Sequence, residues 1–144
     1  MDLRYSISNQ PHDIDPRAID VLNSMKDPGP VDIILILYDG CTDYLKKSIE
    51  YSKKGDMKEK NIYANKAGDI IFELDKALNF QVGGEIAENL RSLYVLMGRN
   101  IVDAVQNENS DGLEVVVNML ANLREGWAHV AETTKNIRGN PLEA

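Results

Sequence analysis

The chain has few of the residues on which small catalytic, metal-binding and disulfide-bonded proteins depend. Cys41 is the only cysteine among 144 residues, so no intrachain disulfide can form, and a reducing compartment is expected. The two histidines are His12 and His129, and Glu125 with His129 lacks the Glu-x-x-His spacing of carboxylate metal bundles. No P-loop, Gly-x-Ser-x-Gly motif or Cys–His cluster occurs. We therefore expect no enzyme, no metal site and no cofactor.

Positive charge and long apolar runs are also scarce. The chain has 16 basic and 23 acidic side chains, which give a net charge of -7. Nucleic acids and anionic membranes both need a basic footprint, so neither is expected as a partner. No apolar run approaches the roughly 20 residues that cross a bilayer, and the first ten residues lack a signal-peptide pattern. These features predict a cytoplasmic protein without membrane insertion.

Proline is confined almost entirely to the start of the chain, where four of the five prolines precede residue 31. Asp15-Pro16 is typical of a helix N-cap followed by proline at the first helical position. Apolar residues then repeat at helical spacing up to Met25. We predict an N-terminal tail with one short amphipathic helix over 1–28, a helical bundle domain over 29–135, and a frayed C-terminus over 136–144.

Four longer segments carry apolar residues at spacings of three and four, which is typical of amphipathic helices. The first opens at Pro30, the second covers about 56–78, the third 85–107 and the fourth 110–134. Short breaks between long helices imply antiparallel neighbours. The predicted fold class is all-α, an antiparallel up-and-down four-helix bundle with an additional short N-terminal helix.

The first of these segments allows two interpretations. Residues 33–38 are apolar without a break and end in Asp39-Gly40, which is the pattern of a buried strand entering a turn. As a helix, the same segment presents one apolar face, and the chain offers no second strand to pair with. We therefore predict a helix. Gly40 then lies inside it, at a cost of about 1 kcal/mol relative to alanine, so we expect something to compensate, such as a close approach by another backbone.

Several of the predicted helices have more apolar surface than one core stripe needs. Either the wide stripes are buried in a wide core that the N-terminal helix helps to cover, or they are left for a partner. A contiguous apolar surface is rarely left bare on a monomer. Its occupant could be a helix laid in a groove, the protein's own tail, or a second copy of the chain.

Three stretches occur together in one order: LILYDGCTDYLKKSIEY, GGEIAENLRSLYVLMGRNIVDA and LREGWAHV. Together they resemble the flagellin export chaperones of the FliS family over about residues 29 to 132. The resemblance implies a cytoplasmic bundle that is not an enzyme. It implies binding of the disordered C-terminal segment of flagellin in apolar grooves, which prevents premature polymerisation and aids delivery to the flagellar export gate. It also implies that the tail can occupy part of this surface.

The resemblance and the surplus stripes together suggest where a partner binds. We expect a monomer or weak homodimer. A dimerising helical adaptor without a flagellin client is the alternative that the sequence leaves open. Leu90 and Trp127 are expected to hold the bundle together. The candidate partner-binding residues are Ile33, Ile36, Tyr44, Ile86, Asn89, Leu93, Tyr94, Met97, Val115 and Met119.

Overall fold

The structure is a computed structural model that describes residues 30–78 and 80–139. For a few residues at the start of the third helix and near the end of the fourth, only the backbone is described. The structure contains four helices and, within these ranges, no strand. They are α3 (Pro30–Lys53), α4 (Met57–Lys76), α5 (Phe80–Gln106) and α6 (Asp111–Gly139). The all-α prediction is confirmed. The predicted short N-terminal helix falls on residues that lie outside the described ranges.

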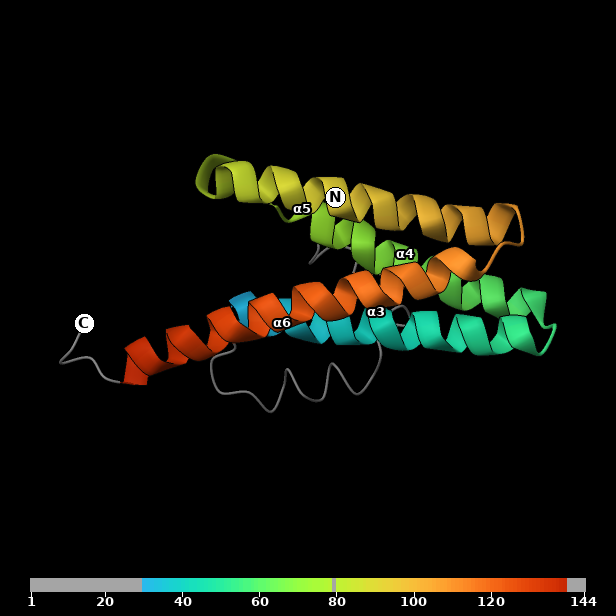
Figure 1. Ribbon diagram of the computed structural model, residues 1–144, viewed down its shortest axis with the longest axis horizontal. Coiled ribbons are helices and arrows are strands. Elements are labelled where there is room, and N and C mark those ends of the chain that lie inside the picture. The colour runs from blue at the N-terminus through green and yellow to red at the C-terminus, as the bar shows by residue number, and fades with distance from the viewer. Residues whose placement is uncertain (1–29, 79, 140–144) are drawn as a thin grey trace.

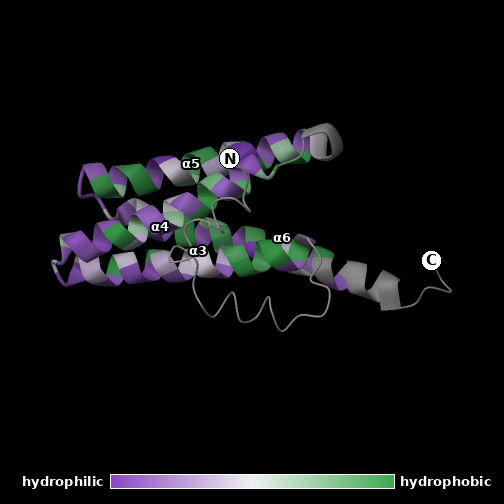
Figure 2. Cartoon of the chain, turned by 180° about the vertical axis from the view of Figure 1, so that it is seen from behind, coloured by the Kyte–Doolittle hydropathy of each residue, from purple (hydrophilic) through white to green (hydrophobic). Residues whose placement is uncertain are grey.

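The helices form an up-and-down bundle (Figure 1). Successive helices run in opposite directions, and α6 returns to pack beside α3. Each helix therefore packs against two neighbours. Helices α5 and α6 meet at their connecting loop and diverge toward the other end of the bundle, as both views show. Figure 2 shows apolar and polar residues on every helix, as expected for amphipathic helices.

The run of apolar residues near the start of the bundle is helical. Helix α3 is continuous from Pro30 to Lys53, so the helix interpretation is confirmed and the strand interpretation is wrong. The expected backbone approach at Gly40 is also wrong. A Cβ added there would lie 3.9 Å from Cδ1 of Ile70, which is ordinary van der Waals contact. A side chain, not a main chain, packs against this glycine.

Local signals fix several helix ends. The Asp56 side chain accepts a hydrogen bond from the backbone N–H of Glu59 at 3.1 Å and so caps the start of α4. In α5, Gly84 has φ 51° and ψ -121°, so the helix is interrupted there and is regular from Glu85 onward. Helix α6 continues to Gly139, beyond its predicted end.

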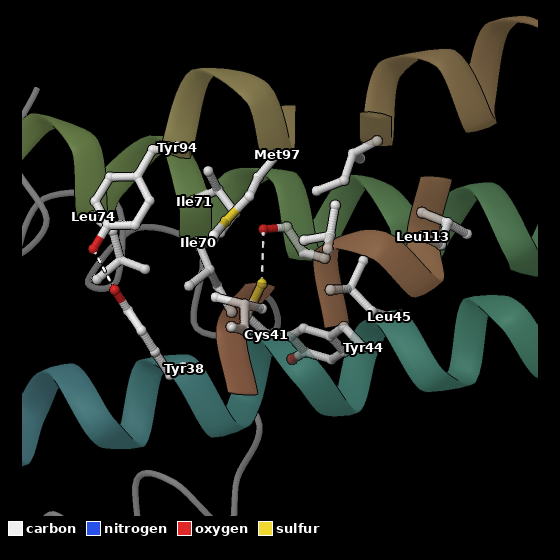
Figure 3. Close-up of a cluster of buried hydrophobic side chains, with 14 of the residues drawn as sticks. Tyr38, Cys41, Tyr44, Leu45, Ile70, Ile71, Leu74, Tyr94, Met97 and Leu113 are labelled. Atoms are coloured by element: carbon white, nitrogen blue, oxygen red, sulfur yellow. Dashed lines mark hydrogen bonds between the residues drawn. The ribbon is translucent and has the colours of Figure 1, made fainter. Parts of the chain in front are cut away.

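The core lies between the four helices (Figure 3). Lys60 is fully buried within it, where its Nζ donates a hydrogen bond to the carbonyl of Ala104. This bond links α4 to α5 and gives a buried polar group a hydrogen-bond partner. No described helix is both long enough and apolar enough to span a membrane. The largest buried apolar side chains in the core include Tyr38, Leu45, Met97, Leu113, Val116 and Leu120.

Candidate binding grooves

The first groove lies at the end of the bundle where α3 and α5 begin and α4 finishes. Its volume is about 690 Å³, and we call it the end groove. The divergence of α5 from α6 opens the bundle at this end (Figure 1). Among the described residues no charged side chain lines it. It is lined by apolar and aromatic residues within 30–37 of α3, within 74–78 at the end of α4 and within 83–94 of α5, and by Trp127 of α6.

The rim of the end groove presents apolar side chains to solvent. Ile86 on α5 is 68% exposed, while Ile33 and Ile34 on α3 are half-buried. Leu90, one turn further along α5, is buried. Together, the exposed Ile86 and the largely apolar hollow form an exposed hydrophobic surface, which in soluble proteins marks an interaction site.

A hydrogen-bonded aromatic cluster forms the floor of this groove. The Tyr38 and Tyr94 hydroxyl oxygens lie 2.6 Å apart, and the two rings meet edge to face (Figure 3). The Trp127 indole N–H donates to the Tyr38 hydroxyl oxygen at 3.1 Å. Because the indole is only a donor, Tyr38 is the acceptor in this bond, whereas either hydroxyl can be the donor between Tyr38 and Tyr94. The cluster ties α3, α5 and α6 together directly beneath the end groove.

Both tyrosines are neutral at physiological pH, and burial moves their pKa values further from it. Burial raises the pKa of the Tyr38 phenol above its ordinary value of 10.0, and its hydrogen bonds to Tyr94 and Trp127 oppose part of that rise. Burial also raises the pKa of Tyr94, and its hydrogen bond to Tyr38 raises it further. The floor is therefore uncharged through the physiological pH range, consistent with a site for apolar side chains.

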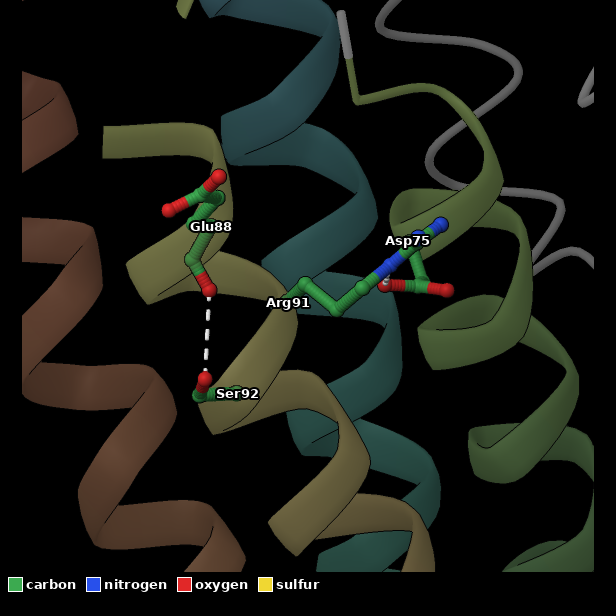
Figure 4. Close-up of polar contacts among 4 residues, drawn as sticks. All are labelled: Asp75, Glu88, Arg91 and Ser92. Carbon is green, nitrogen blue, oxygen red and sulfur yellow. Dashed lines mark hydrogen bonds and ion pairs between the residues drawn. The ribbon is translucent and has the colours of Figure 1, made fainter. Parts of the chain in front are cut away.

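A second groove runs along the outer face of α4 and α5. Its volume is about 700 Å³, and we call it the side groove. It is lined by residues within 65–75 of α4 and 94–103 of α5, and by Asn107 just after α5. Phe72 and Val102 on its walls are 58% and 51% exposed. Three aspartates line it, one of which, Asp75, accepts a hydrogen bond from Arg91 Nε at 3.1 Å (Figure 4).

The structure separates the ten candidate partner-binding residues into three groups. Ile33 and Ile86 come together on the end groove, with Tyr94 beneath them. Asn89 and Val115 are exposed, and Leu93 and Met119 are half-buried, on parts of α5 and α6 that line neither groove. The other three, Ile36, Tyr44 and Met97, are buried in the core, and Tyr94 is buried as well.

Burial of these four has a common cause. Each helix of the closed bundle packs on two neighbours, so two adjacent stripes are covered rather than one. Tyr44, for example, lies on the second stripe of α3 and packs its ring 6.0 Å from that of Tyr63 on α4. These side chains do not form the exposed rim, and their part in partner binding stays a prediction.

The side groove was not among the predicted sites. Phe72 departs from the core stripe of α4, which is visible in the sequence. Its proximity to Val95 and Val102 depends on how α4 and α5 are aligned, and helical periodicity does not determine that alignment. In the described part of the chain no three His, Cys, Asp or Glu side chains gather closely enough to hold a metal ion.

Comparison with known proteins decides the family. The family model described as flagellar protein FliS matches residues 16–134. The chain belongs to the FliS family. Relatives named flagellar secretion chaperone FliS include the Salmonella typhimurium protein, which is 30% identical over 114 residues, covering 78% of this chain and 84% of the relative. The Bacillus subtilis protein is 27% identical over 116 residues, covering 81% and 86%.

A third relative, the Pseudomonas aeruginosa protein named flagellar secretion chaperone FliSB, is 29% identical over 111 residues, covering 77% of this chain and 88% of the relative. The resemblance drawn from the three sequence stretches is thus confirmed. The FliS match begins at residue 16, so it also includes part of the predicted N-terminal tail.

The three FliS-like stretches of this chain meet in space beside the end groove. Tyr38 from the first, Tyr94 from the second and Trp127 from the third form the aromatic cluster. Next to it, Arg124 Nε and Nη2 donate to the two carboxylate oxygens of Asp39 at 2.6 and 3.0 Å. This paired geometry joins the first stretch to the third. Residues far apart in the sequence therefore converge on one structural unit.

Proposed function

We propose that this FliS-family protein is a cytoplasmic export chaperone for flagellin. In this proposal the end groove receives apolar side chains of the disordered C-terminal segment of flagellin, which keeps flagellin from polymerising before it is delivered to the flagellar export apparatus. The observation that carries the proposal is an open, uncharged groove at the point where the three FliS-like stretches converge. The relatives named flagellar secretion chaperone support it.

The chemistry of the end groove suits a disordered client. Such a segment loses conformational entropy when it binds, so it needs many apolar contacts rather than a few specific ones. If it forms a short helix, its residues at spacings of three and four project to one side and can enter a single groove. A hollow of about 690 Å³ with an exposed Ile86 on its rim accepts several such side chains.

The proposal predicts that a charge on the rim weakens client binding. In Ile86→Glu, a carboxylate would have to be desolvated against apolar client side chains, so we expect at least about a tenfold loss of affinity, or about 1.4 kcal/mol. The measurement is isothermal titration with the C-terminal segment of flagellin from the same organism. Because Ile86 is 68% exposed, circular dichroism should show unchanged helix content.

Ile62→Glu is the matched control. Ile62 is an exposed isoleucine on α4 that lines neither groove, so its variant should bind like the wild type. Equal affinity of the Ile86→Glu variant and the wild type would argue against the end groove as the client site. Absence of flagellin binding together with a stable dimer in light scattering would instead favour a dimerising adaptor.

A further inference from the structure

The side groove differs chemically from the end groove, although both are apolar hollows of similar volume. Its lining includes Asp69, Asp75 and Asp103 against one basic residue, Arg99. The described lining of the end groove includes no charged side chain. Two grooves with such different edges select different partners, because desolvated charges at a groove edge reject segments that cannot pair with them.

The floor of the side groove is shaped for a helix. Val95 and Val102 are seven residues apart on α5 and so lie on one face, two turns from each other. Exposed Phe72 faces the same groove from α4. A Cβ added to Gly98 would find no atom within 4 Å, so this glycine leaves open space in the groove. The α5 wall spans residues 94–106, about 20 Å at 1.5 Å per residue. This is the length of about three to four helical turns.

We propose that the side groove is a docking site for an amphipathic helix of a second protein, one whose apolar stripe is flanked by lysine or arginine. The stripe would cover Phe72, Val95 and Val102, and the flanking cations would face the aspartates of the groove edges. Asp75 already pairs with Arg91 (Figure 4), and Asp103 accepts hydrogen bonds from the side-chain amides of Asn107 and Asn109. A partly exposed ion pair contributes little, and each carboxylate has further acceptor positions for an incoming cation. The net charge of -7 favours approach of a basic segment.

This occupant is distinct from the flagellin segment proposed for the end groove, and the inference does not depend on that proposal. Among the described residues, Tyr94 alone lines both grooves. It is buried and held by its hydrogen bond to Tyr38, so it forms a fixed partition between them. Both grooves can therefore be filled at the same time.

The test uses the full chain and two synthetic helical peptides of about 18 residues, a length at which helices begin to be stable in water. Both carry a Leu/Ala stripe, flanked by lysines in one and by glutamates in the other. Binding is measured by fluorescence anisotropy at low salt. The test variant is Gly98→Gln, whose side chain would fill the open space in the groove. The control is Gly126→Gln on α6, where an added Cβ likewise meets no atom within 4 Å.

The lysine-flanked peptide should bind the wild type and Gly126→Gln equally, and Gly98→Gln at least about tenfold more weakly. The glutamate-flanked peptide should bind the wild type at least about tenfold more weakly than the lysine-flanked peptide does. Equal binding of the two peptides, or unchanged binding to Gly98→Gln, would overturn the proposal. So would an equal loss of flagellin-segment affinity in Gly98→Gln, which would assign the groove to the client. A dimer that Gly98→Gln dissociates would assign it to a second copy and overturn the proposal as well.

Discussion

At the scale of single residues, Tyr94 connects the core to both grooves. Its ring is buried among core side chains, and its hydroxyl lies 2.6 Å from that of Tyr38. From the sequence it is a candidate contact residue because it flanks the core stripe and carries a polar group. In the structure the Tyr94 hydroxyl is hydrogen-bonded to Tyr38 inside the protein, so Tyr94 stabilises the floor of the end groove.

Substitutions of Tyr94 should therefore act first on stability. We expect Tyr94→Phe to lower the free energy of unfolding by about 1 kcal/mol, because one buried hydrogen bond is lost while the ring remains. Tyr94→Ala should cost about 3–5 kcal/mol, because it leaves a cavity where the ring was. Urea unfolding followed by circular dichroism measures both. A cost below about 1 kcal/mol for Tyr94→Ala would show that the ring is not part of the core.

The buried tyrosines also predict how stability depends on pH. Burial raises the pKa of Tyr38 and Tyr94 above the ordinary value of 10.0, so the folded state holds their protons more tightly than the unfolded state. Their contribution to stability is complete below pH 10.0 and is lost as the pH rises above it. Burial likewise raises the pKa of the Cys41 thiol above its ordinary 9.0, which extends the loss to slightly lower pH.

We therefore expect the free energy of unfolding to fall at alkaline pH, and to fall less steeply in Tyr94→Phe than in the wild type. The reason is that the variant has one fewer buried group to ionise. Cys41→Ala is a useful companion variant, because it removes the buried thiol whose ionisation lowers stability from a lower pH onward. Parallel curves for the wild type and Tyr94→Phe above pH 10.0 would contradict the assignment of Tyr94 to this effect.

At the scale of elements, spacing predicts the helices well. Apolar residues at spacings of three and four form one stripe along each helix, and cap residues such as Asp56 mark the helix ends. Spacing does not say how many neighbours a helix has. Helix α3 packs between α4 and α6, so its second stripe, with Ile36 and Tyr44, is covered by the bundle itself. That depends on the assembled fold and could not be predicted from one helix.

Glycines inside the helices provide a test at this scale. Gly98→Ala should raise the free energy of unfolding by about 0.5–1 kcal/mol, because alanine favours the helix and the added Cβ meets no atom. Gly112→Ala should lower it, because the added Cβ would lie 2.6 Å from Oδ1 of Asn100 and force that side chain to move. Thermal unfolding of both variants measures the difference. A Gly112→Ala variant as stable as Gly98→Ala would contradict the close packing of α5 on α6 at this point.

At the scale of the whole molecule, function depends on how the four helices are placed. The sequence stretches that identify the FliS family could be recognised in the chain, and their residues converge only once α3, α5 and α6 are assembled. The end groove exists because α5 diverges from α6 at the end where α5 begins (Figure 1). Of the predicted partner-binding residues, only Ile33, Ile86 and Tyr94 line it. Helical spacing carries no information about such divergence.

The central claim, that the end groove receives flagellin, can be tested most directly through Trp127. It is the only tryptophan in the chain, and it lines the end groove. Titration with a tryptophan-free C-terminal segment of flagellin should give a saturable change in Trp127 emission, and Ile86→Glu should move that change to higher peptide concentration. Tight binding by calorimetry with no change in Trp127 emission would place the client elsewhere and contradict the claim.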